Sequence, residues 1–311
     1  MDPRHLVQLS AILECGSISK ASQVLHLTQP TLTHNMQALE ARAGGQLFER
    51  SRFGVRSTAL GEVLAREGRA IARRLRDAEE ACARHRGGYR HTIRLGTGPL
   101  VGAALVPGLV AGLAAVVPGR AFSVQSDRPH LLLDQLVDGR HDLVIAPSWL
   151  DKPPEGIERF LLVRDTVGVF CGPGHPLAAA GVLGPGGEPE WLGVGTASPF
   201  DSPVREMLQE AGVATSGSEV TVMGDAHTAL QILAGGRHLA ALPRYPLRLL
   251  APFYGLVELA LPTAAPRARD IHLWCRSALL EDASMLQVRD FILAHAQGRV
   301  LPGACGEMVG V

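Results

Sequence analysis

Two short helical patterns that meet at a tight turn, within residues 17–50, constrain the fold of this chain more than any other stretch. Thr28 can cap the second segment, and Pro30 falls in its first turn, where a missing N–H costs nothing. Apolar residues lie at helical spacing on both segments: Ala21, Val24 and Leu25 on the first, and Leu32, Met36, Leu39 and Ala43 on the second. Each segment is therefore expected to be a helix that buries one face.

The opposite face of the second helix carries short, neutral side chains that can form hydrogen bonds. Such a row on an exposed helix can read base edges in a major groove of DNA. The candidate DNA-binding residues here are Gln29, Pro30, Thr31, Thr33, His34 and Gln37. An ordinary pair of packed helices, with a polar face that contacts only water, is the alternative, because patterns of this length have many false positives.

The residues that follow favour DNA binding. A basic segment at 51–58 has Gly54 at its centre, and it could form a hairpin wing against a phosphate backbone. The candidate phosphate contacts are Arg50, Arg52 and Arg56.

At this point the chain resembles a known family. The segments are Ser-Ile-Ser-Lys-Ala-Ser at 17–22, Thr-Gln-Pro-Thr-Leu-Thr at 28–33, Leu-Glu at 39–40 and Leu-Phe-Glu-Arg at 47–50. In order and spacing they resemble the winged helix-turn-helix of the LysR-type transcriptional regulators. His34 departs from that pattern, since the family usually carries a long basic or amide side chain there, and Gly44-Gly45 adds flexibility after the helix. The resemblance implies a DNA-binding regulator rather than an enzyme.

Length and charge agree with a small basic head on a larger body. The 311 residues suffice for two or three domains, and 46% of them are hydrophobic. Residues 1–90 hold 14 Lys and Arg against nine Asp and Glu, whereas the remainder holds 16 against 21. A net charge of +5 therefore precedes one of −5, as expected of a DNA-binding head on a soluble body.

Cysteine usage and the N-terminal residues predict a cytoplasmic protein. Five widely spaced cysteines without a Cys-x-x-Cys pair are typical of reduced thiols, so we expect no metal and no cofactor. Asp2 and Arg4 precede a broken apolar run, which is not the pattern of a signal peptide. The uncharged stretch from Gly98 to Gly119 is long enough to span a bilayer, but Pro107 and Pro118 interrupt it, and a helix of a globular domain is favoured.

A long helical pattern runs from Thr58 to about Arg86, and Gly87-Gly88 then forms a hinge. Its apolar stripe is heptad-like and favours pairing of two subunits, in a homodimer or homotetramer. The candidate dimerisation residues are Leu60, Leu64, Ile71, Leu75, Ala78 and Cys82. The alternative is an amphipathic helix that lies on its own domain.

After the hinge, strand and helix patterns alternate. The order βαβαβ over residues 93–146 implies a parallel sheet with helices on its faces, and a second α/β unit follows over residues 191–242. Two lobes with crossover segments fit this length better than one large sheet. Gly174-His175-Pro176-Leu177-Ala178 and residues 235–243 resemble the effector-binding domain of the same family, which is similar in fold to periplasmic binding proteins.

Ligands in such sheets bind beyond the carboxyl ends of the strands, so the strand-to-loop junctions are candidates for an effector site. The candidate residues are Thr97, Gly98, Pro99, Leu100, Pro147, Ser148, Thr196, Ser198, Phe200, Asp225 and His227. Thr97, Ser198 and Asp225 could instead only cap helices, and His227 could be an ordinary surface histidine. Free amides at helix starts favour an anion, and we expect a small carboxylate, although Asp225 argues against it.

The sequence thus predicts an α/β protein with an N-terminal all-α winged helix-turn-helix and a two-lobed effector domain similar to periplasmic binding proteins. The expected divisions are a DNA-binding domain (1–57), a dimerisation helix and hinge (58–90), an effector domain (91–301) and a tail (302–311). The expected partners are promoter DNA, a small-molecule effector, a second copy of the chain and RNA polymerase, with no membrane. The alternative function is a metabolite-binding protein or enzyme whose helical head binds other proteins.

Overall fold

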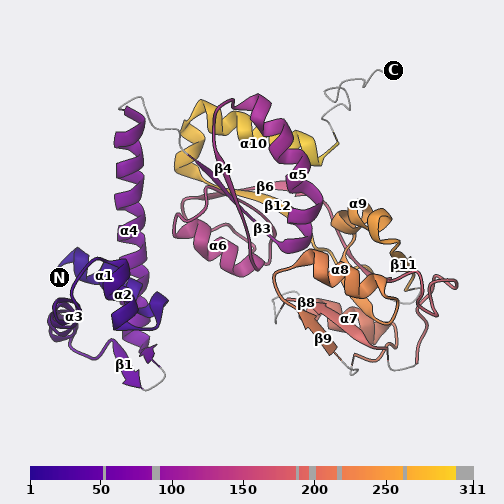
Figure 1. Ribbon diagram of the computed structural model, residues 1–311, viewed down its shortest axis with the longest axis horizontal. Helices are drawn as coiled ribbons and strands as arrows, with labels where there is room; N and C mark the ends of the chain where they lie inside the picture. Colours follow the sequence, from indigo (N-terminus) through magenta and orange to yellow (C-terminus); the bar gives the residue numbers. More distant parts are fainter. Residues whose placement is uncertain are drawn as a thin grey trace. The chain divides into compact units, whose positions relative to one another are not determined.

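The computed structural model describes residues 1–51, 54–85, 92–186, 189–195, 201–215, 219–261 and 265–298. The chain forms two compact units, Met1–His91 and Thr92–Val311. The first unit is a helical head with a two-stranded hairpin (Figure 1). Its elements are α1 (Pro3–Cys15), α2 (Ile18–Val24), α3 (Gln29–Ala43), β1 (Phe48–Ser51), β2 (Gly54–Ser57) and α4 (Ala59–His85).

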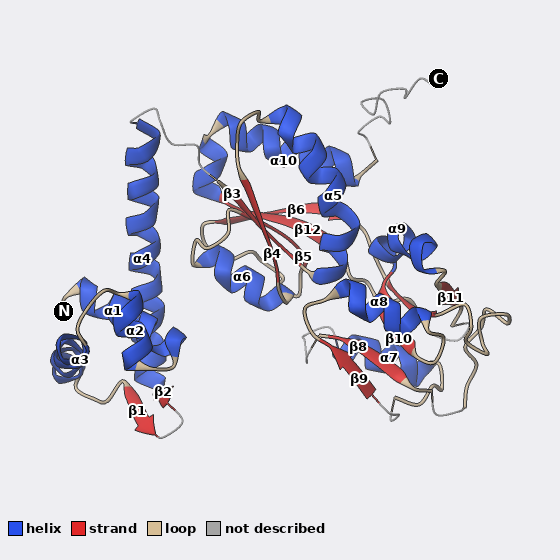
Figure 2. Cartoon of the chain, viewed as in Figure 1, coloured by secondary structure: helices blue, strands red, loops and turns tan. Residues whose placement is uncertain are grey.

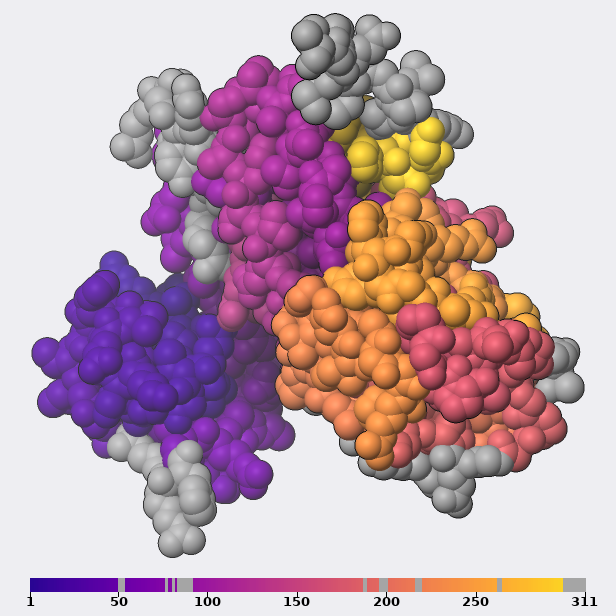
Figure 3. Space-filling model, turned by 45° about the vertical axis from the view of Figure 1, so that its right-hand side comes forward, coloured from indigo at the N-terminus to yellow at the C-terminus, as the bar shows by residue number. Residues whose placement is uncertain are grey.

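Apolar side chains from α1, α2, α3 and the start of the hairpin meet in one core. The head that encloses this core is the indigo and violet part of Figure 3. The fully buried side chains include Leu9, Ile12, Leu32, Met36, Leu39 and Leu47. The buried face predicted for the second helix is confirmed. So is its predicted cap, because the Thr28 side chain accepts a hydrogen bond from Thr31 N at 3.3 Å.

The prediction for α2 is wrong at Val24, which is 64% exposed. Ser22 is buried in its place, and its hydroxyl donates to Ser19 O at 2.8 Å, so the buried polar group is satisfied. Because α2 ends at Val24, it contributes Ile18 and Ala21 to the core, and Leu25 packs against the core from the turn.

The helix α4 begins where predicted, because Thr58 Oγ1 accepts from Gly61 N at 3.0 Å. Its first half packs closely on α1. A Cβ atom added to Gly68 would lie 2.0 Å from Leu6 O, so only glycine permits this approach of the two backbones. Gly68 interrupts the apolar stripe of α4 because the backbone of α1 packs against the helix at this position.

The second unit consists of two α/β lobes, as predicted (Figure 2). Lobe I contains β3 (Ile93–Thr97), α5 (Pro99–Val116), β4 (Phe122–Ser126), α6 (Pro129–Val137), β5 (Leu143–Pro147), β6 (Ile157–Val163), β12 (Ile271–Arg276), the 3-10 helix η1 (Ser277–Glu281) and α10 (Ala283–Ala296). Lobe II contains β7 (Val167–Cys171), β8 (Trp191–Val194), α7 (Asp201–Glu210), β9 (Glu219–Val222), α8 (Ala226–Ala234), β10 (Leu239–Pro243), α9 (Arg244–Tyr254) and β11 (Val257–Leu259).

Each lobe has a five-stranded sheet, in the orders β4-β3-β5-β12-β6 and β11-β7-β10-β8-β9. Strands β3, β4 and β5 are parallel, as their alternation with helices predicted. The later strands make both sheets mixed, because β12 runs antiparallel to β5 and β6, and β7 antiparallel to β10. The chain leaves lobe I at the carboxyl end of β6, which lies at the same edge of the sheet as the carboxyl ends of β3 and β5. It returns to lobe I at this edge, where β12 begins. The returning strand must therefore run in the opposite direction.

Helices cover both faces of the lobe I sheet. On one face α5 and α10 pack over β3 and β12, and on the other α6 packs over the buried Trp274. Among the described residues, α5 is the one helix long and apolar enough by composition to cross a membrane. Its Leu105, Leu109 and Leu113 pack in the lobe I core, so it serves as the globular helix expected for this uncharged stretch.

A buried carboxylate joins the amino ends of β3 and β5. Asp142 is fully buried and accepts from Arg94 N and Nη2, each at 2.8 Å, and from Arg276 Nη2 at 2.9 Å. Two guanidinium groups and one amide thus compensate the burial of its charge.

Replacement of Gly68 by alanine tests the contact between α1 and α4. On an exposed helix this change stabilises by about 1 kcal/mol, but here the new methyl group meets Leu6 O, and we expect a loss of about 1–3 kcal/mol. Urea unfolding of the full chain measures it, with Glu67→Ala on the exposed side of α4 as a near-neutral control. A gain in stability with Gly68→Ala would show that the helices are not in close contact.

Candidate functional site

The polar face predicted on α3 points out of the head. Gln29, Pro30, Thr31, His34 and Gln37 are exposed, and Thr33 is half-buried. Because the buried face of α3 is fixed in the core, the exposed face offers neutral donors and acceptors on a rigid helix. This is the shape and chemistry of a helix that enters a major groove.

Two side-chain hydrogen bonds hold α3 to the other helices of the head. Asn35 Nδ2 donates to Gln8 Oε1 on α1 at 2.9 Å, and Ser19 Oγ on α2 donates to Gln29 Oε1 at 3.3 Å. The second bond orients the Gln29 amide at the start of α3, with its Nε2–H groups left to meet another acceptor.

The predicted hairpin wing is present as β1 and β2, which pair antiparallel with Arg50 opposite Val55. Val55 N donates to Gly16 O at 2.9 Å, in the turn between α1 and α2. Gly54 has φ +119°, and a Cβ there would lie 2.5 Å from Gly16 O, so the hairpin can close on the head only with glycine at this position.

Glu40 fixes the start of the wing, because its Oε1 accepts from Leu47 N at 2.9 Å. Arg56 is exposed on β2. Arg50 lies in β1, but its side chain is outside the described part, and Arg52 lies outside the described residues altogether. Of the predicted phosphate contacts, the geometry therefore presents Arg56 on the hairpin beside α3.

The candidate dimerisation residues do not all face one way. Leu64 and Ile71 pack partly against the core of their own head, as in the alternative interpretation of this helix. Leu60 is 37% exposed and Leu75 58% exposed, and Ala78 and Cys82 are also exposed. An apolar surface is thus left in the second half of α4.

In lobe I the predicted junction after β3 surrounds the N-terminus of α5. Thr97 is buried, and its hydroxyl donates to Gly98 O at 3.3 Å. Gly98 is the N-cap of α5, and no side chain of the described residues caps it. Gly102 N makes the first bond of the helix, to Gly98 O at 2.7 Å, which leaves the earlier N–H groups without an acceptor inside the helix.

Pro99 and Leu100 begin α5, and Leu100 reaches into the other lobe. Its side chain packs with Phe170 and Leu192 in the core of lobe II. A ligand at this junction can therefore reach the main-chain N–H of Leu100 but not its side chain. The positive end of the α5 dipole lies here, which suits an anion.

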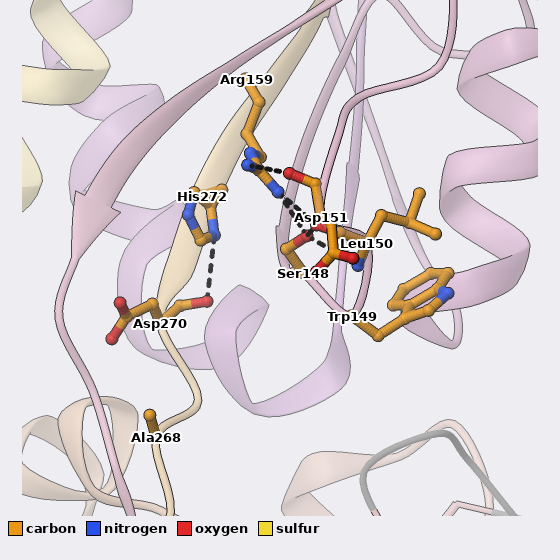
Figure 4. Close-up of a pocket in the computed structure, with 8 residues that line it drawn as sticks. All are labelled: Ser148, Trp149, Leu150, Asp151, Arg159, Ala268, Asp270 and His272. Atoms are coloured by element: carbon orange, nitrogen blue, oxygen red, sulfur yellow. Dashed lines mark hydrogen bonds between the residues drawn. The ribbon is translucent and has the colours of Figure 1, made fainter.

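The junction after β5 forms a tight loop. Pro147 ends the strand, and Ser148 Oγ donates to Leu150 O at 3.0 Å and accepts from Leu150 N at 3.1 Å. The loop borders an open pocket of about 310 Å³ on lobe I (Figure 4). The pocket is lined by Ser148, Trp149, Leu150, Asp151, Arg159, Ala268, Asp270 and His272.

In lobe II the junction after β9 is occupied by a helix cap. Asp225 Oδ1 accepts from His227 N at 2.9 Å and from Thr228 N at 3.3 Å. The hydrogen bond from the Thr228 hydroxyl is the main cause that lowers the pKa of Asp225, so this carboxylate is charged at neutral pH. His227 Nδ1 is 2.9 Å from Tyr254 Oη on α9. The other predicted residues of this lobe, Thr196, Ser198 and Phe200, lie outside the described residues.

The sequence interpretation missed four polar residues of the pocket, namely Asp151, Arg159, Asp270 and His272. Arg159 and His272 stand inside the apolar runs of β6 and β12. A charged or titratable residue within a strand-like run is the signal that could have indicated them. Within the described part, no group of three or more His, Cys, Asp or Glu side chains is placed to hold a metal ion.

Sequence comparison identifies both parts of the chain. A family described as "Bacterial regulatory helix-turn-helix protein, lysR family" matches residues 3–62, and the "LysR substrate binding domain" matches residues 86–297. The regulator PcaQ of Agrobacterium fabrum is 28% identical over 58% of this chain. That match spans 58% of the length of PcaQ.

One relative is matched over more of its length, and a solved structure is matched almost completely. The small neutral protease regulatory protein of Streptomyces coelicolor is 30% identical over 76% of this chain and 71% of its own length. A full-length OxyR variant from Pseudomonas aeruginosa superposes with a TM-score of 0.60 over 94% of both chains, at 20% identity.

The hydrogen bond from Leu47 N to Glu40 gives a test of how the wing is held. Glu40→Ala leaves the amide of the buried Leu47 without its acceptor, and we expect the head to lose about 1–3 kcal/mol. Glu40→Gln keeps an acceptor oxygen and should be nearly neutral. Urea unfolding, together with hydrogen exchange at the Leu47 amide, measures both variants. Equal exchange rates in the alanine variant and the parent would contradict this role.

Proposed function

This chain belongs to the LysR family of bacterial transcriptional regulators, and on that basis we propose that it binds promoter DNA through its head and that a small effector bound to lobes I and II alters this binding. The observation that carries the proposal is the exposed neutral face of α3 beside Arg56 on a hairpin that is hydrogen-bonded to the head. Gln29, Thr33, His34 and Gln37 meet base edges or nearby phosphates. Arg50, Arg52 and Arg56 meet the DNA backbone.

We further propose that two copies pair through α4. Leu75, Ala78 and Cys82 are exposed at intervals of three and four residues, in the half of the helix beyond its packing on α1. A dimer places two recognition helices on DNA, so a change in how the subunits pack alters the spacing or bend that they impose.

The effector that the geometry favours is a small carboxylate at the start of α5. The uncapped N–H groups there suit an anion. Asp225 is charged and exposed at the start of α8, which disfavours an anion on that side. We therefore assign the carboxylate group of the effector to lobe I, at the start of α5. The rest of the effector would contact the other predicted strand-to-loop junctions.

The proposed divisions are a DNA-binding domain (1–57), a dimerisation helix and hinge (58–90), an effector domain (91–301) and a tail (302–311). The proposed partners are promoter DNA, the effector, a second copy of the chain and RNA polymerase, in the cytoplasm. The alternative function is a metabolite-binding protein or enzyme whose head binds other proteins. Such a protein would not bind DNA, and this separates it from a regulator.

Gel-shift titration with the promoter region beside the gene itself tests DNA binding. If each head neutralises about four phosphates, a dimer should show a log-log salt slope of about −7. Arg56→Ala should weaken binding to all DNA alike and make the slope shallower by about 1 per head, whereas Gln29→Ala should reduce discrimination between sites by about 1–3 kcal/mol.

Lys152→Ala is the control for this titration, since it removes an exposed cation outside the head. Absence of salt-dependent binding to any fragment would end the regulator proposal. A loss of specific and nonspecific binding in equal ratio by both head variants would contradict the separate roles of α3 and the hairpin.

A thermal-shift screen of small carboxylates tests the effector class. An acid that binds the folded chain at a hundred times its Kd should stabilise it by about 2.7 kcal/mol. The methyl ester of each acid, which lacks the charge, is the matched control and should give a smaller shift. If no acid raises the melting temperature, or if esters act as well as acids, the anion preference is wrong.

A further inference from the structure

Lys20 on α2 lies beside the helix to which the proposed function assigns base contacts. It is the third residue of α2, and its side chain is exposed. The residue before it, Ser19, donates from Oγ to Gln29 Oε1 at 3.3 Å, at the start of α3. This hydrogen bond holds the first turn of α2, and Lys20 with it, next to the first predicted base contact.

The same end of α2 is also tied to the hairpin. Ser17 is the N-cap of α2, and its side chain accepts from Lys20 N at 3.5 Å. The main-chain oxygen of Gly16 accepts from Val55 N at 2.9 Å, on the hairpin that carries Arg56. The short segment that ends at Lys20 is therefore hydrogen-bonded to the hairpin as well as to α3.

The exposed face of α2 carries a single charge. Its residues are Ser19, Lys20, Gln23 and Val24. They lie at positions i, i+1, i+4 and i+5, on the side of the helix opposite its buried residues. Lys20 is the one charged residue on this face, so no neighbour on its own helix neutralises it.

The ammonium group of Lys20 also forms no ion pair with a carboxylate of the described residues. Arginines at other surfaces do form them: Arg69 lies 3.2 Å from Glu62, and Arg237 lies 2.6 Å from Glu190. An ammonium group has three N–H donors and no acceptor. A cation of this kind beside a base-reading helix can pair with a phosphate of the DNA backbone.

We propose that Lys20 contacts a DNA phosphate next to the bases that Gln29 meets. The inference rests on the proposed binding of DNA by the head, and it adds a backbone contact on α2 to those on the hairpin. Because a phosphate contact carries no sequence information, Lys20 positions the start of α3 in the groove and does not select the base. Acylation of its amine removes the charge and with it the contact.

Acetylation of the chain in the presence of DNA tests the contact directly. Lys20 and Lys152 are the two lysines among its 30 Lys and Arg residues, and Lys152 lies outside the head. With about nine tenths of the protein bound to a promoter fragment, acetic anhydride should modify Lys20 about tenfold more slowly than in free protein, because only free protein reacts. Lys152 is the internal control and should react at the same rate, as measured by mass spectrometry of the digested chain.

Two variants separate charge from structure. Lys20→Gln removes the charge, Lys20→Arg keeps it, and both new residues are good helix formers. Lys20→Gln should make the log-log salt slope shallower by about 1 per head and weaken a dimer about tenfold or more at 0.1 M salt, for specific and nonspecific fragments alike. Lys20→Arg should bind as the parent does and should no longer be weakened by prior acetylation. Lys152→Gln should change nothing.

Equal acetylation of Lys20 in free and bound protein would overturn the proposal, as would an unchanged salt slope in Lys20→Gln. In both cases the parent chain still shifts the fragment, so the loss of this contact is distinct from the failure of DNA binding itself. A parent chain that binds no fragment would contradict the proposed function and this contact together.

Discussion

One aspartate, Asp165, is hydrogen-bonded to both passages of the chain between the lobes. Asp165 Oδ1 accepts from Thr166 N at 2.8 Å, in the outgoing segment, and from Tyr245 N at 2.9 Å, at the start of α9. Its main-chain oxygen accepts from Arg269 N at 2.7 Å, in the returning segment. Burial raises the pKa of this carboxyl, and the hydrogen bonds from Tyr245 N and Thr166 N reduce, without removing, the cost of burying its charge. Asp165 thus holds the start of α9 and the segment that leads into β12 beside the outgoing chain.

Near this point each lobe inserts one side chain into the other. Leu100 of α5 packs in the core of lobe II, and Tyr245 of α9 packs against the core of lobe I and donates its hydroxyl to Ala296 O at 2.9 Å. The lobes therefore change their angle only if these contacts shift together. The anion site proposed at the start of α5 shares a residue with this contact, so a ligand that binds there can bias one arrangement of the lobes.

Local patterns in the sequence predicted what depends on local chemistry. The Thr28 and Thr58 caps, the buried face of α3 and the glycine-centred hairpin all follow from a few neighbouring residues, and the structure confirms them. The error at Val24 arose because three apolar residues at helical spacing do not show where a seven-residue helix ends.

Features that depend on distant pairing could not be predicted in this way. The sequence did not indicate α9, whose two prolines obscure its helical pattern, or the antiparallel return of β12, which depends on the second passage between lobes. The pocket was missed for the same reason. Ser148, Arg159 and His272 come from three separate segments, and only the register of β6 with β12 brings the last two together.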